Sequence, residues 1–128
     1  MRLVGIDYGK KRVGVALSDE EAKFALPYGV WANDQQLVAN IKALCLEKLV
    51  DAVVIGESRN LDGTENEVLK DITLLKSVLE GELEIPVYLE PEFYTSAEAE
   101  RVQGKSALTD ASAAALILKS YLERHSTT

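Results

Sequence analysis

The stretch that decides the fold lies near the N-terminus and reads Leu3-Val4-Gly5-Ile6-Asp7-Tyr8-Gly9-Lys10-Lys11-Arg12-Val13-Gly14-Val15-Ala16-Leu17-Ser18. Two short apolar runs, residues 2–7 and 12–18, flank a polar turn that contains glycine and lysine. Runs of this length, bounded by turn residues, are typical of β-strands joined in a hairpin. We therefore predict an antiparallel pair of strands, with Asp7 at the carboxyl end of the first.

Beyond this hairpin, the sequence predicts a third strand and then an alternation of helices and strands. Pro27 and Gly29 in the third strand favour a position at the edge of the sheet, because proline cannot donate to a strand ladder. Apolar residues at three- and four-residue intervals predict helices, and short continuous apolar runs predict buried strands. The expected elements are a strand at 24–31, a helix at 37–49, a strand at 51–56, a helix at 64–81 opened by a capping box, a strand at 86–90, a helix from 95 and a last helix at 110–123.

This order of elements predicts an α/β fold, with a mixed five-stranded sheet flanked by helices. Three antiparallel strands come first, and parallel strand–helix units follow. The first strand then lies at the centre of the sheet, near the point where the strand order reverses and ligands tend to bind. The length of 128 residues and the 47% hydrophobic content suit a single domain over 1–128.

Bulk composition excludes several classes of function. The net charge of −7 opposes general adhesion to a polyanion, so any affinity for phosphate must be local. The single cysteine, Cys45, has no second cysteine to pair with and falls among apolar helical positions, which predicts a buried hydrophobe. The only histidine, His125, lies in a C-terminal tail that we expect to fray. Because no apolar run reaches membrane length and no leader pattern is present, we expect a cytoplasmic protein without a membrane partner.

Three acidic residues are candidates for a metal site at the carboxyl edge of the sheet: Asp7, Glu92 and Asp110. Taken singly, each has a structural interpretation: a turn cap for Asp7, a solvated loop residue for Glu92, and a helix-dipole contribution of about 0.3–1 kcal/mol for Asp110. Together, three carboxylates converge only if bound cations offset their repulsion. Oxygen ligands suit Mg²⁺ or Mn²⁺, and two such ions activate water for in-line cleavage of a phosphodiester.

Four segments of the chain resemble a known family. They are residues 5–19, Asp62-Gly63-Thr64-Glu65-Asn66, Glu92-Phe93-Tyr94-Thr95-Ser96-Ala97-Glu98-Ala99 and Asp110-Ala111-Ser112-Ala113-Ala114-Ala115-Leu116-Ile117-Leu118. In this order, and over nearly the whole chain, they are similar to the YqgF family of Holliday-junction resolvases, also described as pre-16S rRNA nucleases. The agreement of four blocks in sequence makes the resemblance specific, although each block is short.

The resemblance implies a ribonuclease H-like three-layer fold and a metal-dependent endonuclease, with Asp7, Glu92 and Asp110 as catalytic and metal-binding residues. It implies a role in maturing the 5′ end of pre-16S rRNA, in resolving Holliday junctions, or in both. Two departures from the family pattern bear on activity. Pro91-Glu92-Phe93 stands where the family has Asp-Glu-Arg, and Gly56-Glu57-Ser58 stands where it has Gly-Leu-Pro. The arginine missing at Phe93 would have placed positive charge beside the metals.

Basic residues are candidates for contacts with nucleic-acid phosphates, which position a strand without reading its sequence. Lys11 and Arg12 lie in the hairpin turn, and Arg59 and Arg101 are weaker candidates. For each of them a solvated surface position is the competing interpretation. The sequence leaves open whether the partner is structured RNA or branched DNA. It also leaves open whether the chain acts as a monomer or as a homodimer, the form that symmetric cleavage of two strands would favour.

Two other functions fit parts of the sequence. The early Gly-Ile-Asp-x-Gly hairpin also occurs in actin-like ATP-binding phosphotransferases, but that class resembles two copies of such a core, and 128 residues make one. Phe93 in place of the family's arginine favours a catalytically weak scaffold that binds nucleic acid or supports ribosome biogenesis.

Overall fold

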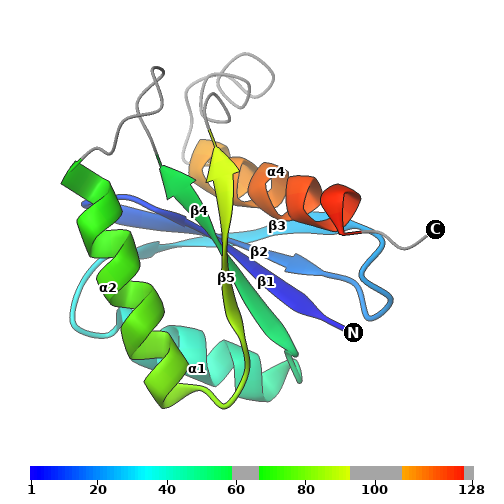
Figure 1. The fold of residues 1–128 in the computed structure, drawn as a ribbon, viewed down its shortest axis with the longest axis horizontal. Coiled ribbons are helices and arrows are strands. Elements are labelled where there is room, and N and C mark those ends of the chain that lie inside the picture. Colours follow the sequence, from blue (N-terminus) through cyan, green and yellow to red (C-terminus); the bar gives the residue numbers. More distant parts are fainter. Residues whose placement is uncertain (59–66, 93–107, 126–128) are drawn as a thin grey trace.

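The computed structural model describes residues 1–58, 67–92 and 108–125, and of residues 58, 67, 92 and 108–110 it describes the backbone alone. Every strand and helix predicted within these ranges is present, whereas the helix expected from residue 95 and the capping box at 64–67 fall largely outside them. The elements, shown in Figure 1, are β1 (Leu3–Tyr8), β2 (Arg12–Ser18), β3 (Ala25–Ala32), α1 (Leu37–Glu47), β4 (Ala52–Ser58), α2 (Glu67–Glu82), β5 (Val87–Glu92) and α4 (Leu108–Arg124).

The strands form one five-stranded sheet in the order β3-β2-β1-β4-β5. β1 pairs antiparallel with β2, and β2 antiparallel with β3, while β4 and β5 run parallel to β1. The predicted mixed sheet is therefore confirmed, with β1 at its centre and β3 at one edge. Parallel strands end at the same edge of a sheet, so the carboxyl ends of β1, β4 and β5 lie together.

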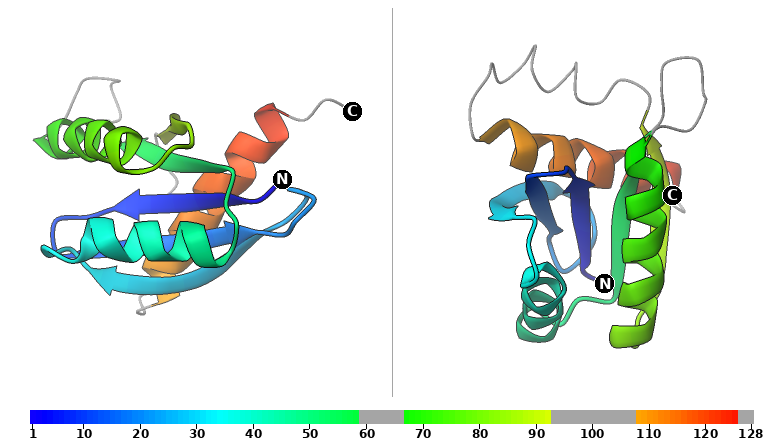
Figure 2. Two further views of the ribbon diagram at one scale, coloured as in Figure 1. Left: turned by 90° about the horizontal axis from the view of Figure 1, so that it is seen from below. Right: turned by 90° about the vertical axis from the view of Figure 1, so that its left-hand side faces the viewer.

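Helices cover both faces of the sheet, which gives three layers. α1 and α2 pack on one face through a core that includes Ile6, Ile41 and Ile72. α4 packs on the other face through a smaller core that includes Leu3 and Leu118. In the left view of Figure 2, α1 lies in front of the sheet and α4 crosses behind it. The alternation of β1 thus sends even-numbered residues toward α1 and α2, and odd-numbered residues toward α4.

Gly5 lets α4 approach the central strand closely. A Cβ atom at position 5 would lie 2.8 Å from Leu118 Cβ and 2.9 Å from the carbonyl oxygen of Ala114. Ala111 and Ala113 are also buried, so the helix presents small side chains along this surface. The alanine-rich composition of the last helix therefore allows this close packing.

Most element boundaries differ from the sequence-based expectations by one or two residues; α1, for example, ends at Glu47 and not at Leu49, and β4 continues to Ser58. β5 continues through Pro91 to Glu92, so Glu92 is the last strand residue and not a loop residue; proline is tolerated because β5 is an edge strand. α4 begins at Leu108, which makes Asp110 its third residue, and α2 runs one residue past Gly81. His125 is held against the end of α4, where its amide donates to the carbonyl of Tyr121 and their ring centroids lie 4.2 Å apart, while the tail at 126–128 lies outside the described residues.

Two further expectations concern burial and membranes. Cys45 of α1 is buried in the core between the sheet and the two helices α1 and α2, as predicted. Burial raises the pKa of its thiol to about 11. Within residues 1–58, 67–92 and 108–125, no helix is both long and apolar enough to cross a membrane.

Candidate active site

Asp7 is the best-defined residue of the predicted site. It lies next to last in β1, is half-buried, and pairs with Gly14 of β2. Since Leu3 and Gly5 face α4, the two-residue repeat of a strand places Asp7 on the same face. The residues before it are fully buried, so the carboxylate marks the point where the central strand leaves the apolar core.

The turn after Asp7 is held to β3 by an asparagine that the sequence reasoning missed. Asn33 Nδ2 donates to the carbonyl of Gly9 at 2.8 Å, and the Asn33 amide donates to the carbonyl of Lys11 at 3.0 Å. A Cβ atom at Gly9 would lie 2.6 Å from the carbonyl oxygen of Arg12, so only glycine closes this turn without a shift. The turn therefore presents exposed Lys10, Lys11 and Arg12 from a fixed backbone.

The backbone positions of Glu92 and Asp110 agree with a shared edge, although their side chains lie outside the described part of the structure. Glu92 pairs with Ser58 at the ends of two strands that run parallel to β1. Asp110 lies one helical turn before Ala114, whose carbonyl oxygen approaches Gly5. α4, which carries Asp110, thus contacts both β1, which carries Asp7, and β5, which carries Glu92, while β4 separates the two strands.

A buried carboxylate that the sequence reasoning missed connects two of these elements. Glu90 Oε2 accepts hydrogen bonds from Ser120 Oγ at 2.8 Å and from Arg124 at 3.1 Å. Nearby, the rings of Tyr88 and Tyr121 stack at 5.6 Å, and burial, Tyr88 and Glu90 raise the pKa of Tyr121. These contacts join β5, two residues before Glu92, to the C-terminal half of α4. The available signal was a glutamate directly after the apolar residues Val87-Tyr88-Leu89.

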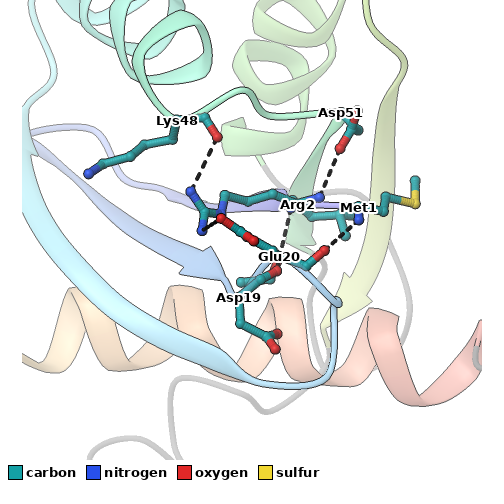
Figure 3. A network of polar contacts seen from close by, with 8 residues as sticks. Met1, Arg2, Asp19, Glu20, Lys48 and Asp51 are labelled. Atoms are coloured by element: carbon teal, nitrogen blue, oxygen red, sulfur yellow. Dashed lines mark hydrogen bonds and ion pairs between the residues drawn. The ribbon is translucent and has the colours of Figure 1, made fainter.

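Among the described side chains, which include Asp7 but not Glu92 or Asp110, no three acids, histidines or cysteines lie close enough to hold a metal ion. A hollow of about 380 Å³ lies at the amino end of β1, lined in part by Glu20, Lys48 and Asp51. Arg2 also lines this hollow, and Figure 3 shows it between Glu20, Lys48 and Asp51: its guanidinium pairs with Glu20 at 3.5 Å, and its amide donates to Asp51. Glu20 and Asp51 are thus engaged by Arg2, at the opposite end of β1 from Asp7.

Comparison with known proteins identifies the family. Residues 1–124 match the family described as RuvX, Holliday junction resolvase. The chain belongs to this family. A relative from Syntrophus aciditrophicus, named "Putative pre-16S rRNA nuclease", is 36% identical over 137 residues, which cover 96% of this chain and 89% of the relative. The resemblance identified in the four sequence blocks is therefore confirmed.

Two resolvases are among the solved structures with a similar fold. T. thermophilus RuvC, in complex with a Holliday junction substrate, superposes with a TM-score of 0.60 at 20% identity over 98% of this chain and 97% of that chain. The fowlpox virus resolvase, in complex with Holliday junction DNA, gives a TM-score of 0.59 at 14% identity over 97% and 98% of the two chains. At these identities the likeness concerns the fold, and it confirms the ribonuclease H-like architecture of this RuvX member.

The expectation of a nuclease is confirmed at the level of the RuvX family, whose members are named for hydrolysis of nucleic acids. Of the predicted phosphate-binding residues, Lys11 and Arg12 are exposed in the hairpin turn. Arg59 and Arg101 lie outside the described residues, as does Phe93, which replaces the arginine of the family pattern. The roles of all these residues stay predictions.

Proposed function

We propose that this chain is a divalent-metal-dependent endonuclease, in which Asp7, Glu92 and Asp110 hold Mg²⁺ or Mn²⁺ against a nucleic-acid phosphate. The observation that carries the proposal is the position of Asp7: a half-buried carboxylate at the carboxyl end of the central strand, on the face where Gly5 admits α4. Ligands of α/β sheets bind at this kind of edge. The carboxylate oxygens of the three residues are hard ligands, which these ions prefer.

The chain's own residues supply position and charge for this reaction. Bound ions would lower the pKa of a coordinated water and stabilise the leaving oxygen. Asp7 is held by β1, whose neighbours on both sides are hydrogen-bonded strands, so its backbone has little freedom to move. Glu92 stands on a strand that Glu90 ties to α4, and Asp110 stands on α4 itself. The acids would then be presented from a rigid frame, which favours a fixed coordination geometry.

The substrate we propose is structured RNA, namely the 5′ end of pre-16S rRNA, with branched DNA junctions as a second substrate. The name of the Syntrophus aciditrophicus relative supports the first, and the Holliday junction complexes of structural neighbours support the second. Lys11 and Arg12 would contact phosphates beside the acids, with Arg59 and Arg101 as additional contacts. Because the net charge of the chain is −7, this local positive charge would determine where on the protein surface the nucleic acid binds.

The experiment that tests the function is a cleavage assay on two substrates. Purified chain is incubated with a precursor of 16S rRNA and with a four-way DNA junction, in Mg²⁺, in Mn²⁺ and in EDTA. We expect metal-dependent products, and we expect Asp7→Asn to remove them while Asp71→Asn, an exposed carboxylate on α2, leaves them unchanged. If wild type and Asp7→Asn give the same products on both substrates, the nuclease proposal is wrong and a binding scaffold is favoured.

A further inference from the structure

A strip of apolar and aromatic side chains lies uncovered on the outer strand of the sheet. Its members are Phe24, which directly precedes β3, and Leu26, Tyr28 and Trp31 of β3, and we call them the β3 strip. Phe24 is 66% exposed, Leu26 60% and Tyr28 45%. Trp31 is half-buried, and its ring meets that of Tyr28 nearly edge to face, with centroids 6.5 Å apart and planes at 86°. Exposed side chains of this size in one strand require an explanation.

The strip lies on the α1 face of the sheet, beyond the reach of the helix. Leu26 pairs with Leu17 and Trp31 with Val13, and both partners face the core beneath α1 and α2. In the left view of Figure 2, β3 runs beside α1 with no helix in front of it. The strip is therefore an open platform that continues the packed core outward.

Positive charge stands at one end of this platform. Trp31 and Ala32 pair with Val13 and Arg12, and Asn33 ties this end of β3 to the turn that carries Lys10 and Lys11. Residues 8–18 and 22–33 contain no aspartate or glutamate, whereas the whole chain has a net charge of −7. Asp7 lies at this same end of the strands, in register with Gly14 and Val30, but it faces α4, on the side of the sheet opposite the strip, so a bound strand would pass around the turn to reach it.

Acidic residues at the other end of the platform are engaged within the protein. Asp19 Oδ1 accepts the amides of Lys23 and Phe24, at 2.7 and 3.0 Å, and these bonds lower the pKa of Asp19. Glu21 pairs with Lys23 at 2.9 Å. Lys23 is thus paired within the protein, and the exposed basic side chains near the strip are those of the turn at 10–12.

We propose that the β3 strip binds a single-stranded segment of nucleic acid, with bases against Tyr28 and Trp31 and the phosphate backbone at the turn of residues 10–12. Aromatic platforms beside basic residues are the usual means of binding single strands, because every base has a face that stacks. The proposal rests on the proposed function for its direction: the strand leads over the turn toward Asp7. It specifies that the substrate carries an unpaired segment next to the cleaved bond.

A second copy of this chain fits the strip less well. Pro27 in β3 has no amide hydrogen, and the register of β2 and β3 shifts at Val15 and Ala16. Both features interrupt the outer edge along which another strand would pair. A dimer would also contain two positively charged turns at 10–12, which repel each other. A nucleic-acid strand is negatively charged and is attracted to the turn.

Trp31 makes the test direct, because it is the only tryptophan of the chain. Its fluorescence is followed in EDTA, without cleavage, while a single-stranded oligouridylate or oligothymidylate of about 12 nucleotides is added. We expect quenching that weakens as salt is raised, and much weaker quenching by a duplex of the same length. We expect Tyr28→Ala to weaken binding about tenfold, measured by anisotropy of a labelled strand. Tyr88→Ala is the matched control, since Tyr88 is 40% exposed on β5.

The outcomes separate this inference from the proposed function. If single strands leave Trp31 fluorescence unchanged, or if Tyr28→Ala and Tyr88→Ala bind alike, the inference is wrong even when the chain cleaves its substrates. If sedimentation shows a dimer that Tyr28→Ala dissociates, the strip is a contact between copies and the inference is also wrong. If single strands bind through Tyr28 but nothing is cleaved in any metal, the inference holds and the nuclease proposal fails.

Discussion

Glu90 and Arg124 form an ion pair in which only one partner is removed from water. The Glu90 side chain is 2% exposed and that of Arg124 is 57% exposed, with 3.1 Å between the carboxylate and the guanidinium. Glu90 lies on β5 and Arg124 at the end of α4, so the pair closes the interface between two elements that carry proposed site residues. The asymmetry of exposure determines which partner the fold depends on.

We expect Arg124→Met to destabilise the protein more than Glu90→Met. Removing the arginine leaves a buried carboxylate with Ser120 as its described donor, at a cost of about 2–3 kcal/mol. Removing the glutamate returns Arg124 to water and fills the space with an apolar side chain, at a cost of about 1 kcal/mol or less. Urea denaturation of the two variants measures the difference. Equal losses would mean that the buried charge is solvated by other means.

Gly5→Ala tests the contact between the central strand and α4. A methyl group at position 5 would meet Leu118 and the Ala114 carbonyl inside normal contact distance, so we expect a loss of about 1–3 kcal/mol in the free energy of unfolding. Gly29→Ala in β3 is the matched control, because no atom lies within 4 Å of its added Cβ. A Gly5→Ala variant as stable as the control would show that α4 yields at this point.

Metal binding is expected to stabilise the folded chain through Asp7. At a Mn²⁺ concentration about 100 times the Kd, a single site adds about 2.7 kcal/mol, which raises the melting temperature by several degrees. We expect this shift in wild type and in Asp71→Asn, and its loss in Asp7→Asn and in excess EDTA. Thermal unfolding followed by circular dichroism measures it. A shift that survives in Asp7→Asn would place the metal elsewhere.

The Cys45 thiol is expected to be unreactive in the native protein at pH 8. Burial raises its pKa from 9.0 to about 11, so the nucleophilic thiolate is scarce, and iodoacetamide should modify it only in denaturant. The unfolded thiol ionises first, so the stability associated with this shift is present below pH 9 and is lost as the pH rises toward 11. Cys45→Ala should lack this loss. Rapid alkylation of the folded chain would contradict the expected burial.

Much of the fold was predictable because the relevant signals are local. Apolar alternation and run length identified each described strand and helix, and Pro27 identified the edge strand. The end of β5 was misplaced, because a proline reads as a break unless the strand is known to lie at an edge. Asn33 and Glu90 were missed for a different reason: their partners, Gly9, Lys11, Ser120 and Arg124, lie 22 to 34 residues away in sequence.

By itself, the sequence determined the order of elements, the mixed sheet with β1 at its centre, the family, and Asp7 as an acid at the end of the central strand. These follow from residue periodicity and from motifs that are contiguous in the chain. Tertiary structure alone decided how closely α4 approaches Gly5, which charge is buried at the α4 interface, and that the β3 strip stays uncovered beside a basic turn. Such features depend on which distant surfaces meet, and on how much water remains between them, so no local pattern encodes them.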